Sequence, residues 1–317
     1  MDVVEPALGM RASAARRSDT RLRVLRHRLE YAAVRLGVGF ARLLPMRWAT
    51  AAGAALGRSV GPWRRQHRRA LQNLARAFPE KSTDEVETIA RLMWANMGRV
   101  MVETMLIDRI VADPRRLVVS DHEHWAARMS QPGPSIGATL HMGNWELAIL
   151  PFTWAGANPA AVYRSVTNPY VDQYLRDQRK ELYPDGLFGR GNVGDHGDDQ
   201  RTARAIMDFV RRGGRLGLVC DLYDRTGMPV PFFGRDAKTQ AIGAMIARRI
   251  GARIWLSRCK RIGTQSRFEI ELKELRVPRT ANQAEDIRWT MVHMQQQFEA
   301  WIREAPEQWM WSNRRWS

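Results

Sequence analysis

The stretch Ser135–Ala148, which reads SIGATLHMGNWELA, constrains the chain more than any other. It opens with a short apolar run that ends on His141, a pattern typical of a buried strand. Gly143 then allows a turn, and we expect Asn144 to cap a new helix. This order predicts His141 at the carboxyl end of a strand, with Glu146 in the first turn of the next helix and close enough to contact it. Ligands of open α/β sheets bind at such strand ends, so a functional site is expected here.

The pairing of His141 with Glu146 suggests general acid–base chemistry. A neutral imidazole can take the proton of a hydroxyl as its oxygen attacks a carbonyl, and a carboxylate behind the ring stabilises the imidazolium that forms. No serine or cysteine is paired with His141 in the sequence, so direct attack by a substrate hydroxyl is the simpler mechanism. Backbone N–H groups after Asn144 are candidate donors to the oxyanion. The alternative is a structural histidine, with Glu146 as a solvated first-turn acid.

Strand-like and helix-like segments alternate along most of the chain. Five further strands are predicted, at 117–119, 160–163, 215–220, 254–258 and 268–273. The alternation predicts an α/β fold, with a single mixed-sheet domain over residues 113–317 and helices flanking the sheet. A helical, membrane-associating region is expected over residues 25–112, after a mobile basic N-terminus at 1–24.

The positive charge is concentrated near the start of the chain. The net charge is +17, and residues 1–76 contain sixteen arginines but four acidic residues. Residues 27–44 have apolar side chains at helical spacing, interrupted by charges, which favours a helix lying in a membrane interface over one spanning the bilayer. An ordinary core-facing helix is the alternative. Such a surface suits lipid headgroups, an acidic carrier protein or nucleic acid.

Three apparent motifs do not carry a function. Cys220 and Cys259 are too few for a disulfide scaffold or a zinc cluster. The sequence GRSVG at 57–61 matches a nucleophile elbow, but no strand precedes it and a proline follows. The consecutive residues 121–124 (DHEH) would point their side chains apart, which argues against a metal site. We therefore expect no metal, and no nucleic-acid-binding motif is recognisable.

The hexapeptide His141–Glu146 (HMGNWE) resembles the catalytic motif of the bacterial lipid A late acyltransferases. These are the lauroyl and myristoyl transferases of the lysophospholipid acyltransferase superfamily. Further matches follow in the family's order, at Asn73–Pro79, Tyr163-Arg164, Asn168-Pro169, Gly213-Gly214, Asp221, Val230–Gly234 and Pro306–Trp309. The similarity covers roughly residues 25 to 316. The hexapeptide alone is shared by many acyltransferases, whereas the ordered set is far more specific.

The resemblance implies transfer of a fatty acyl chain to a hydroxyl of a lipid A precursor. The donor would be acyl carrier protein or coenzyme A, acting as a co-substrate, with no further cofactor. On this reading His141 is the general base and Glu146 its partner. The implied partners are an acidic carrier protein, the glycolipid and the membrane surface. The implied location is the cytoplasmic face of the bacterial inner membrane, with peripheral binding or a single N-terminal helix.

Four residues around the motif are predicted to bind substrate. Gly143 and Asn144 would let the backbone approach a ligand closely. Arg164 would bind a phosphate or polar headgroup, unless it forms a salt bridge to a helix. Asp221 ends a strand at the same sheet edge, so it would line the site or cap a turn.

A proline-rich segment at 223–234 is predicted to be a loop with an aromatic tip. Phe232 and Phe233 would face an acyl chain or pack the loop, and Arg235 would contact the carrier or a phosphate unless it is simply solvated. Two alternatives to the lipid A function stay open. One is acylation of another phospholipid or glycolipid, and the other is a catalytically inactive, basic membrane-binding protein.

Overall fold

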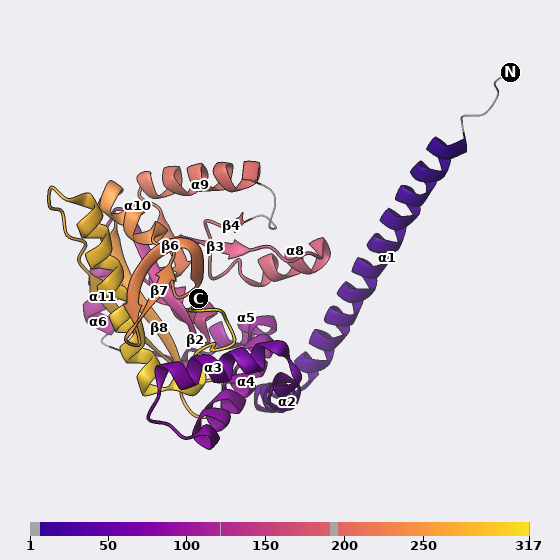
Figure 1. Ribbon diagram of the computed structural model, residues 1–317, viewed down its shortest axis with the longest axis horizontal. Coiled ribbons are helices and arrows are strands. Elements are labelled where there is room, and N and C mark those ends of the chain that lie inside the picture. The colour runs from indigo at the N-terminus through magenta and orange to yellow at the C-terminus, as the bar shows by residue number, and fades with distance from the viewer. Residues whose placement is uncertain (1–6, 121, 191–195, 317) are drawn as a thin grey trace.

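The centre of the protein is a seven-stranded mixed sheet (Figure 1). The computed structural model describes residues 7–120, 122–190 and 196–316. The strand order is β1-β9-β8-β2-β5-β3-β4, in which neighbours from β8 to β4 run parallel, β9 is antiparallel to β8, and β1 is parallel to β9. The strands are β1 (Leu117–Val119), β2 (Ser135–Gly143), β3 (Pro159–Arg164), β4 (Leu187–Arg190), β5 (Arg215–Val219), β8 (Arg253–Arg261) and β9 (Phe268–Leu275). The predicted mixed-sheet α/β fold is confirmed.

Five helices precede the sheet: α1 (Ala7–Leu43), α2 (Met46–Val60), α3 (Arg65–Ala77), α4 (Thr83–Met105) and α5 (Ile107–Val111). Most of α1 extends away from the body of the protein as one long helix (Figure 1). Residues 1–6 of the segment predicted to be mobile lie outside the described residues, and α1 takes up the rest of it. No helix in the described part of the chain is long and apolar enough to cross a membrane.

The remaining helices connect the strands and cover the sheet. They are α6 (His122–Met129), α7 (Leu150–Trp154), α8 (Pro169–Gln178), α9 (His196–Arg211), α10 (Ile242–Ile250) and α11 (Gln283–Glu304). Short 3₁₀ helices lie at Gly61–Trp63, Pro114–Arg116, Trp145–Ile149 and Pro306–Gln308. Asn282 caps α11 by accepting a hydrogen bond from the backbone N–H of Glu285, as its place before an acidic first turn favours.

Strand β2 lies in the middle of the sheet and separates two environments. Because successive side chains of a strand point to opposite faces, its alternate residues have different neighbours. One set is buried in the main hydrophobic core: Ile136, Ala138, Leu140 and Met142. The other set lines a cavity on the opposite face: Gly137, Thr139 and His141. The alternation within one strand thus places His141 in a cavity and anchors its neighbours in the core.

The segment predicted to be a loop with an aromatic tip is instead an antiparallel hairpin. It consists of β6 (Tyr223–Phe232) and β7 (Arg235–Thr239), joined by Phe233 and Gly234. Both joining residues have positive φ, 51° and 68°, as the type I′ turn common in two-residue hairpins requires. The prolines that argued for a loop are tolerated because β6 and β7 form a two-stranded sheet, which has only edge strands.

Candidate active site

His141 is held by Asp221 at the carboxyl end of the sheet. The ring Nδ1 lies 2.8 Å from Oδ1 of Asp221, and the backbone N–H of His141 donates to Oδ2 at 2.9 Å. The two residues meet because β2 and β5 are parallel neighbours with Thr139 beside Val219, and each chain then continues two residues further. Oδ2 of Asp221 also accepts the indole N–H of Trp309 at 2.7 Å. The Asp221 carboxylate therefore fixes both the position and the ring orientation of His141.

The surroundings of this pair shift the pKa of both groups. Burial lowers the pKa of the His141 imidazole, but the charge and hydrogen bond of Asp221, with the charge of Glu146, outweigh burial and raise it above the ordinary value. Burial raises the pKa of Asp221, but the charge of His141 and hydrogen bonds from His141 and Trp309 outweigh it and lower the pKa. The pair thus favours an ionised Asp221 beside a more basic His141.

Glu146 has a different partner from the one predicted. Its two carboxylate oxygens accept hydrogen bonds from Nε and Nη2 of Arg179, at 2.8 and 2.5 Å. The Nδ1 of His141 is already bonded to Asp221, and the guanidinium of Arg179, which is permanently charged, gives the Glu146 carboxylate a bidentate partner. The predicted contact is therefore corrected: the carboxylate that bonds His141 is Asp221, and Glu146 acts on the ring through its charge.

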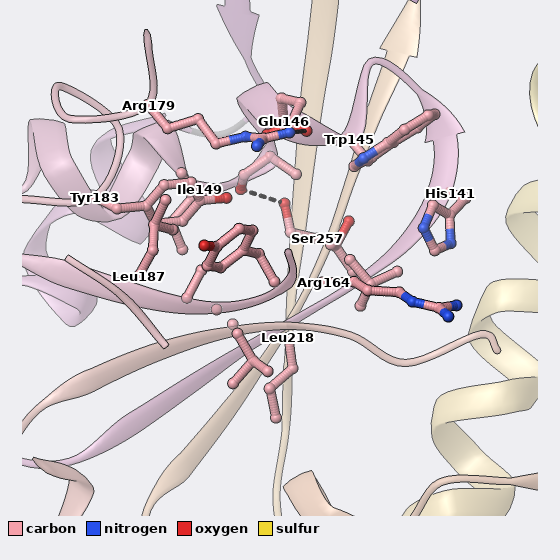
Figure 2. Close-up of a pocket in the computed structure, with 18 of the residues that line it drawn as sticks. His141, Trp145, Glu146, Ile149, Arg164, Arg179, Tyr183, Leu187, Leu218 and Ser257 are labelled. Carbon is pink, nitrogen blue, oxygen red and sulfur yellow. Dashed lines mark hydrogen bonds and ion pairs between the residues drawn. The ribbon is translucent and has the colours of Figure 1, made fainter. Parts of the chain in front are cut away.

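A cavity of about 610 Å³ extends from His141 along the face of the sheet. Figure 2 shows His141 at one end, and Tyr183, Leu187 and Arg179 towards the other. The floor includes Gly217, where an added Cβ would lie 3.3 Å from Cδ1 of Ile149 and 3.5 Å from the ring of Tyr183. The glycine therefore leaves space that a larger residue would fill. The volume is within the range of small-molecule sites, about 300–1,000 Å³.

A comparison with protein families now identifies the chain. A family model described as Bacterial lipid A biosynthesis acyltransferase matches residues 16–317. The chain belongs to this family. A comparison with curated proteins gives no match. The resemblance drawn from the sequence is confirmed, and the family's activity, acyl transfer in lipid A biosynthesis, applies at this coarse level.

The turn after His141 in this acyltransferase requires a glycine. Gly143 has φ 58°, and a Cβ at this position would lie 1.8 Å from the carbonyl oxygen of Cys259. The next residue, Asn144, is fully buried and precedes the 3₁₀ helix Trp145–Ile149 without capping it through its side chain. Asn144 therefore occupies the predicted N-cap position, but its side chain does not cap the helix, because it instead donates to Oε2 of Glu103 at 3.1 Å.

A buried polar cluster on α4 and β8 supports this turn. Glu103, which is fully buried, forms an ion pair with Arg261, whose Nη2 lies 2.7 Å from Oε2. Asn96 lies two turns before Glu103 in α4. It donates to the carbonyl oxygen of Gly143 at 3.2 Å and accepts from Nε of Arg261 at 2.9 Å. Because these groups satisfy one another, the cluster holds the backbone of the His141 turn in place.

The other residues predicted to bind substrate are dispersed. Arg164 is exposed and lines the mouth of the cavity, near His141 in Figure 2. Arg235 is exposed on β7. Phe232 and Phe233 are buried in the aromatic core, in contact with one another and with Trp316. The structure therefore assigns the two phenylalanines to packing and not to the cavity wall.

Sequence reasoning missed several residues of the site. Three residues contact the site from distant parts of the chain: Arg179 bonds Glu146, Trp309 bonds Asp221 and Glu103 bonds Asn144. Trp309 belongs to one of the segments that match the family in order, which was the available signal for it. For Arg179 and Glu103 the sequence offered no signal beyond helical spacing.

Proposed function

We propose that this acyltransferase moves a fatty acyl chain from acyl carrier protein to a hydroxyl of a lipid A precursor, with His141 as the general base. One observation carries the proposal: His141, oriented by a buried Asp221, opens onto a deep cavity on the sheet. Since Nδ1 is bonded to Asp221, Nε2 is the nitrogen that accepts a proton.

The proposed reaction is direct transfer with no covalent enzyme intermediate. The acceptor hydroxyl gives its proton to Nε2 of His141 while its oxygen bonds to the thioester carbonyl carbon. The C–S bond then breaks, the thiolate takes the proton from the imidazolium, and the ester is released. Asp221 stabilises the imidazolium, as the carboxylate of a catalytic triad does. Backbone N–H groups at the start of the 3₁₀ helix after Asn144 are the proposed oxyanion donors.

The cavity is the proposed site of the acyl chain. Its apolar lining includes Ile149 and Leu187, and Gly137 and Gly217 lie side by side in β2 and β5. A chain laid along this floor would place its carbonyl carbon at the His141 end. The proposal gives Arg164 a headgroup role, because its exposed guanidinium at the mouth can bind a phosphate in a bidentate manner.

We propose that the acidic carrier protein docks on the hairpin beside the mouth of the cavity. Leu222 and Gln240, just outside the two ends of the hairpin, line the cavity. Arg235 and Lys238 are exposed on β7 and supply the positive charge that an acidic partner requires. Exchange of acyl carrier protein for acyl-coenzyme A in the transfer assay tests the choice of donor, and faster transfer from coenzyme A would overturn it.

The membrane-associating surface proposed here is the apolar stripe of α1. Its large side chains are exposed at helical spacing: Leu22, Leu25, Leu29, Leu36, Phe40 and Leu43. Arginines flank the stripe and suit anionic headgroups. Flotation with anionic vesicles tests the proposal. The double variant Leu36→Glu and Phe40→Glu should lose binding, whereas Met245→Glu, an exposed position on α10, should retain it. Equal binding by both would place the contact elsewhere.

The decisive experiment is a transfer assay. Purified protein is incubated with an acyl carrier thioester and a tetra-acylated lipid A precursor, and mass spectrometry detects the added acyl group. His141→Ala should abolish transfer, whereas His293→Ala, at a half-buried histidine on α11, should not. Full activity of His141→Ala would overturn the mechanism. Transfer to a lysophospholipid alone would overturn the acceptor, and no transfer to either would favour an inactive membrane-binding protein.

A further inference from the structure

The C-terminal segment Pro306–Trp316 lies alongside the end of β2, the strand that bears His141. Met142 of β2 pairs with Trp309 in an antiparallel bridge, and the backbone N–H of Met310 donates to the carbonyl oxygen of His141 at 3.0 Å. Asn73 of α3 fixes the segment further along by donating to the carbonyl oxygens of Trp311 and Asn313, both at 2.9 Å. The segment is therefore bonded to His141 and to the helical region at once.

Trp309 contributes the segment's direct contact with Asp221. Trp309 is 2% exposed, and its indole N–H donates to Oδ2 at 2.7 Å, while Oδ1 is bonded to Nδ1 of His141. A hydrogen bond to an ionised carboxylate is about twice as strong as one between neutral groups. The tryptophan therefore favours the charged form of Asp221 and restrains the carboxylate from rotating away from Nδ1.

Arg315 brings a second, electrostatic contribution from the same segment. The side chain is 1% exposed, and the two hydrogen bonds described for it end on neutral oxygens, Oγ1 of Thr239 at 2.9 Å and Oε1 of Gln295 at 2.7 Å. Burial lowers the pKa of the Arg315 guanidinium to about 10, and the charge of Asp221 acts against that shift. Gln295 in turn donates to the carbonyl oxygen of Cys220, the residue before Asp221, at 3.0 Å. Two hydrogen bonds therefore connect the buried cation to the backbone next to the carboxylate that holds His141.

We infer that two residues of the C-terminal segment, Trp309 and Arg315, are positioning residues for His141. Trp309 keeps the Asp221 carboxylate directed at Nδ1 of His141, and both residues favour its anionic form. The inference rests on the proposed function, because it presumes that His141 is the base. Burial alone would favour a neutral Asp221, and a neutral carboxyl group would not stabilise the imidazolium. The donors of this segment offset that cost.

The sign of the pH effect follows from the charges around the pair. Three charged groups face His141: Asp221 at its Nδ1, Glu146 from the 3₁₀ helix, and Arg164 at the mouth of the cavity. The charge of Glu146 is itself paired with Arg179. Asp221 faces His141 and Trp309. Arg315 reaches the adjacent residue Cys220 through Gln295. Removing the indole N–H or the Arg315 charge makes Asp221 more basic. Asp221 then holds the imidazolium proton more tightly, so the pKa of His141 rises.

The test compares two tryptophan variants of the full-length protein. Trp309→Phe removes the donor to Asp221, whereas Trp311→Phe removes an equally buried indole whose N–H bonds the carbonyl oxygen of Pro306 at 2.7 Å. Trp309→Phe should lower kcat about 10- to 100-fold with KM little changed, the range expected for a hydrogen bond to a charged group. It should also move the acidic limb of the pH profile of kcat/KM to higher pH, because a more basic His141 stays protonated to higher pH. Trp311→Phe should keep the wild-type pH profile.

A second pair covers the case in which Trp309→Phe fails to fold. Arg315→Met removes the buried charge, and Arg314→Met removes an exposed neighbour that lies over the ring of Tyr223. Arg315→Met should move the acidic limb in the same direction as Trp309→Phe, and Arg314→Met should leave it unchanged. Circular dichroism establishes the folded state of each variant before the kinetics are read.

The inference and the proposed function fail in different ways. If Trp309→Phe matches Trp311→Phe in kcat and in its acidic limb, the inference is overturned while transfer by the wild type stands. If the wild type transfers no acyl group, the proposed function fails. An NMR titration of His141 then still reads the pKa shift without turnover. An unchanged His141 pKa in Trp309→Phe would overturn the positioning role on its own.

Discussion

Two buried carboxylates lie beside or along the cavity, with opposite kinds of partner. Next to the cavity, Asp221 is bonded to the imidazole of His141, with side chains 2% and 15% exposed. Further along its wall, Glu146 is bonded to the guanidinium of Arg179, with side chains 10% and 16% exposed. Burial is therefore similar, and the partner makes the difference.

The difference matters because only one of the two pairs can exchange a proton near neutral pH. An imidazole titrates in this range, whereas a guanidinium stays charged. The Asp221 pair can serve proton transfer, while the pair of Glu146 and Arg179 supplies a fixed arrangement of charge in the cavity wall. Substitutions at Asp221 and Glu146 separate these roles, and substitutions at Gly217 test the cavity itself.

The largest effect is expected from Asp221→Asn. The amide keeps the shape but removes the charge that outweighs burial, so the pKa of His141 falls and the ring is no longer held in the required tautomer. We expect kcat to fall about 10³- to 10⁴-fold, as in triad enzymes that lose this carboxylate. The acidic limb of kcat/KM, set in the wild type by a His141 pKa above the ordinary value, should move to lower pH. Asp208→Asn, at an exposed carboxylate on α9, is the control.

A smaller effect is expected from Glu146→Gln. The substitution leaves Arg179 buried with a neutral partner, so we expect the free energy of unfolding to fall by about 1–3 kcal/mol. The loss of one charge near His141 should lower its pKa less than Asp221→Asn does. Urea denaturation and the pH profile of kcat/KM measure the two effects. A loss of kcat and a shift of the acidic limb as large as those of Asp221→Asn would remove the distinction between the two pairs.

The smallest effect on rate is expected from filling the cavity floor at Gly217. An alanine Cβ there lies at 3.3 Å from Ile149, so the neighbour must yield slightly, and a valine would take more of the cavity volume. Gly217→Ala and then Gly217→Val should shift the preferred donor to progressively shorter acyl chains, with rates for the shortest donor changed only a few-fold. A donor chain-length series measures the shift. An unchanged preference would place the acyl chain outside the cavity.

The local signals in the sequence predicted much of the fold. Alternation and apolar runs located β1, β2, β3, β5, β8 and β9 to within a few residues. The segment 223–234 was misassigned because Pro229 and Pro231 interrupt an ordinary strand pattern. In a two-stranded hairpin each proline can place its missing N–H on an open edge.

The candidate site was predicted less completely than the fold. The sequence placed His141 at a strand end and Glu146 in the following turn, and it drew attention to Asp221 as a residue at the same sheet edge. It paired His141 with the nearer carboxylate along the chain. Strand order reversed that choice, because the adjacency of β2 and β5 brings Asp221 to the ring from 80 residues away.

The sequence by itself determined the strand that ends on His141, the glycine turn that follows it, and the family to which the chain belongs. These depend on side-chain period, on the backbone freedom of Gly143 and on an ordered set of motifs, all of which are properties of neighbouring residues. Only the tertiary structure decided which carboxylate holds His141 and that Trp309 supports it. Hydrogen bonds between distant segments depend on strand order and chain path, which local patterns do not encode.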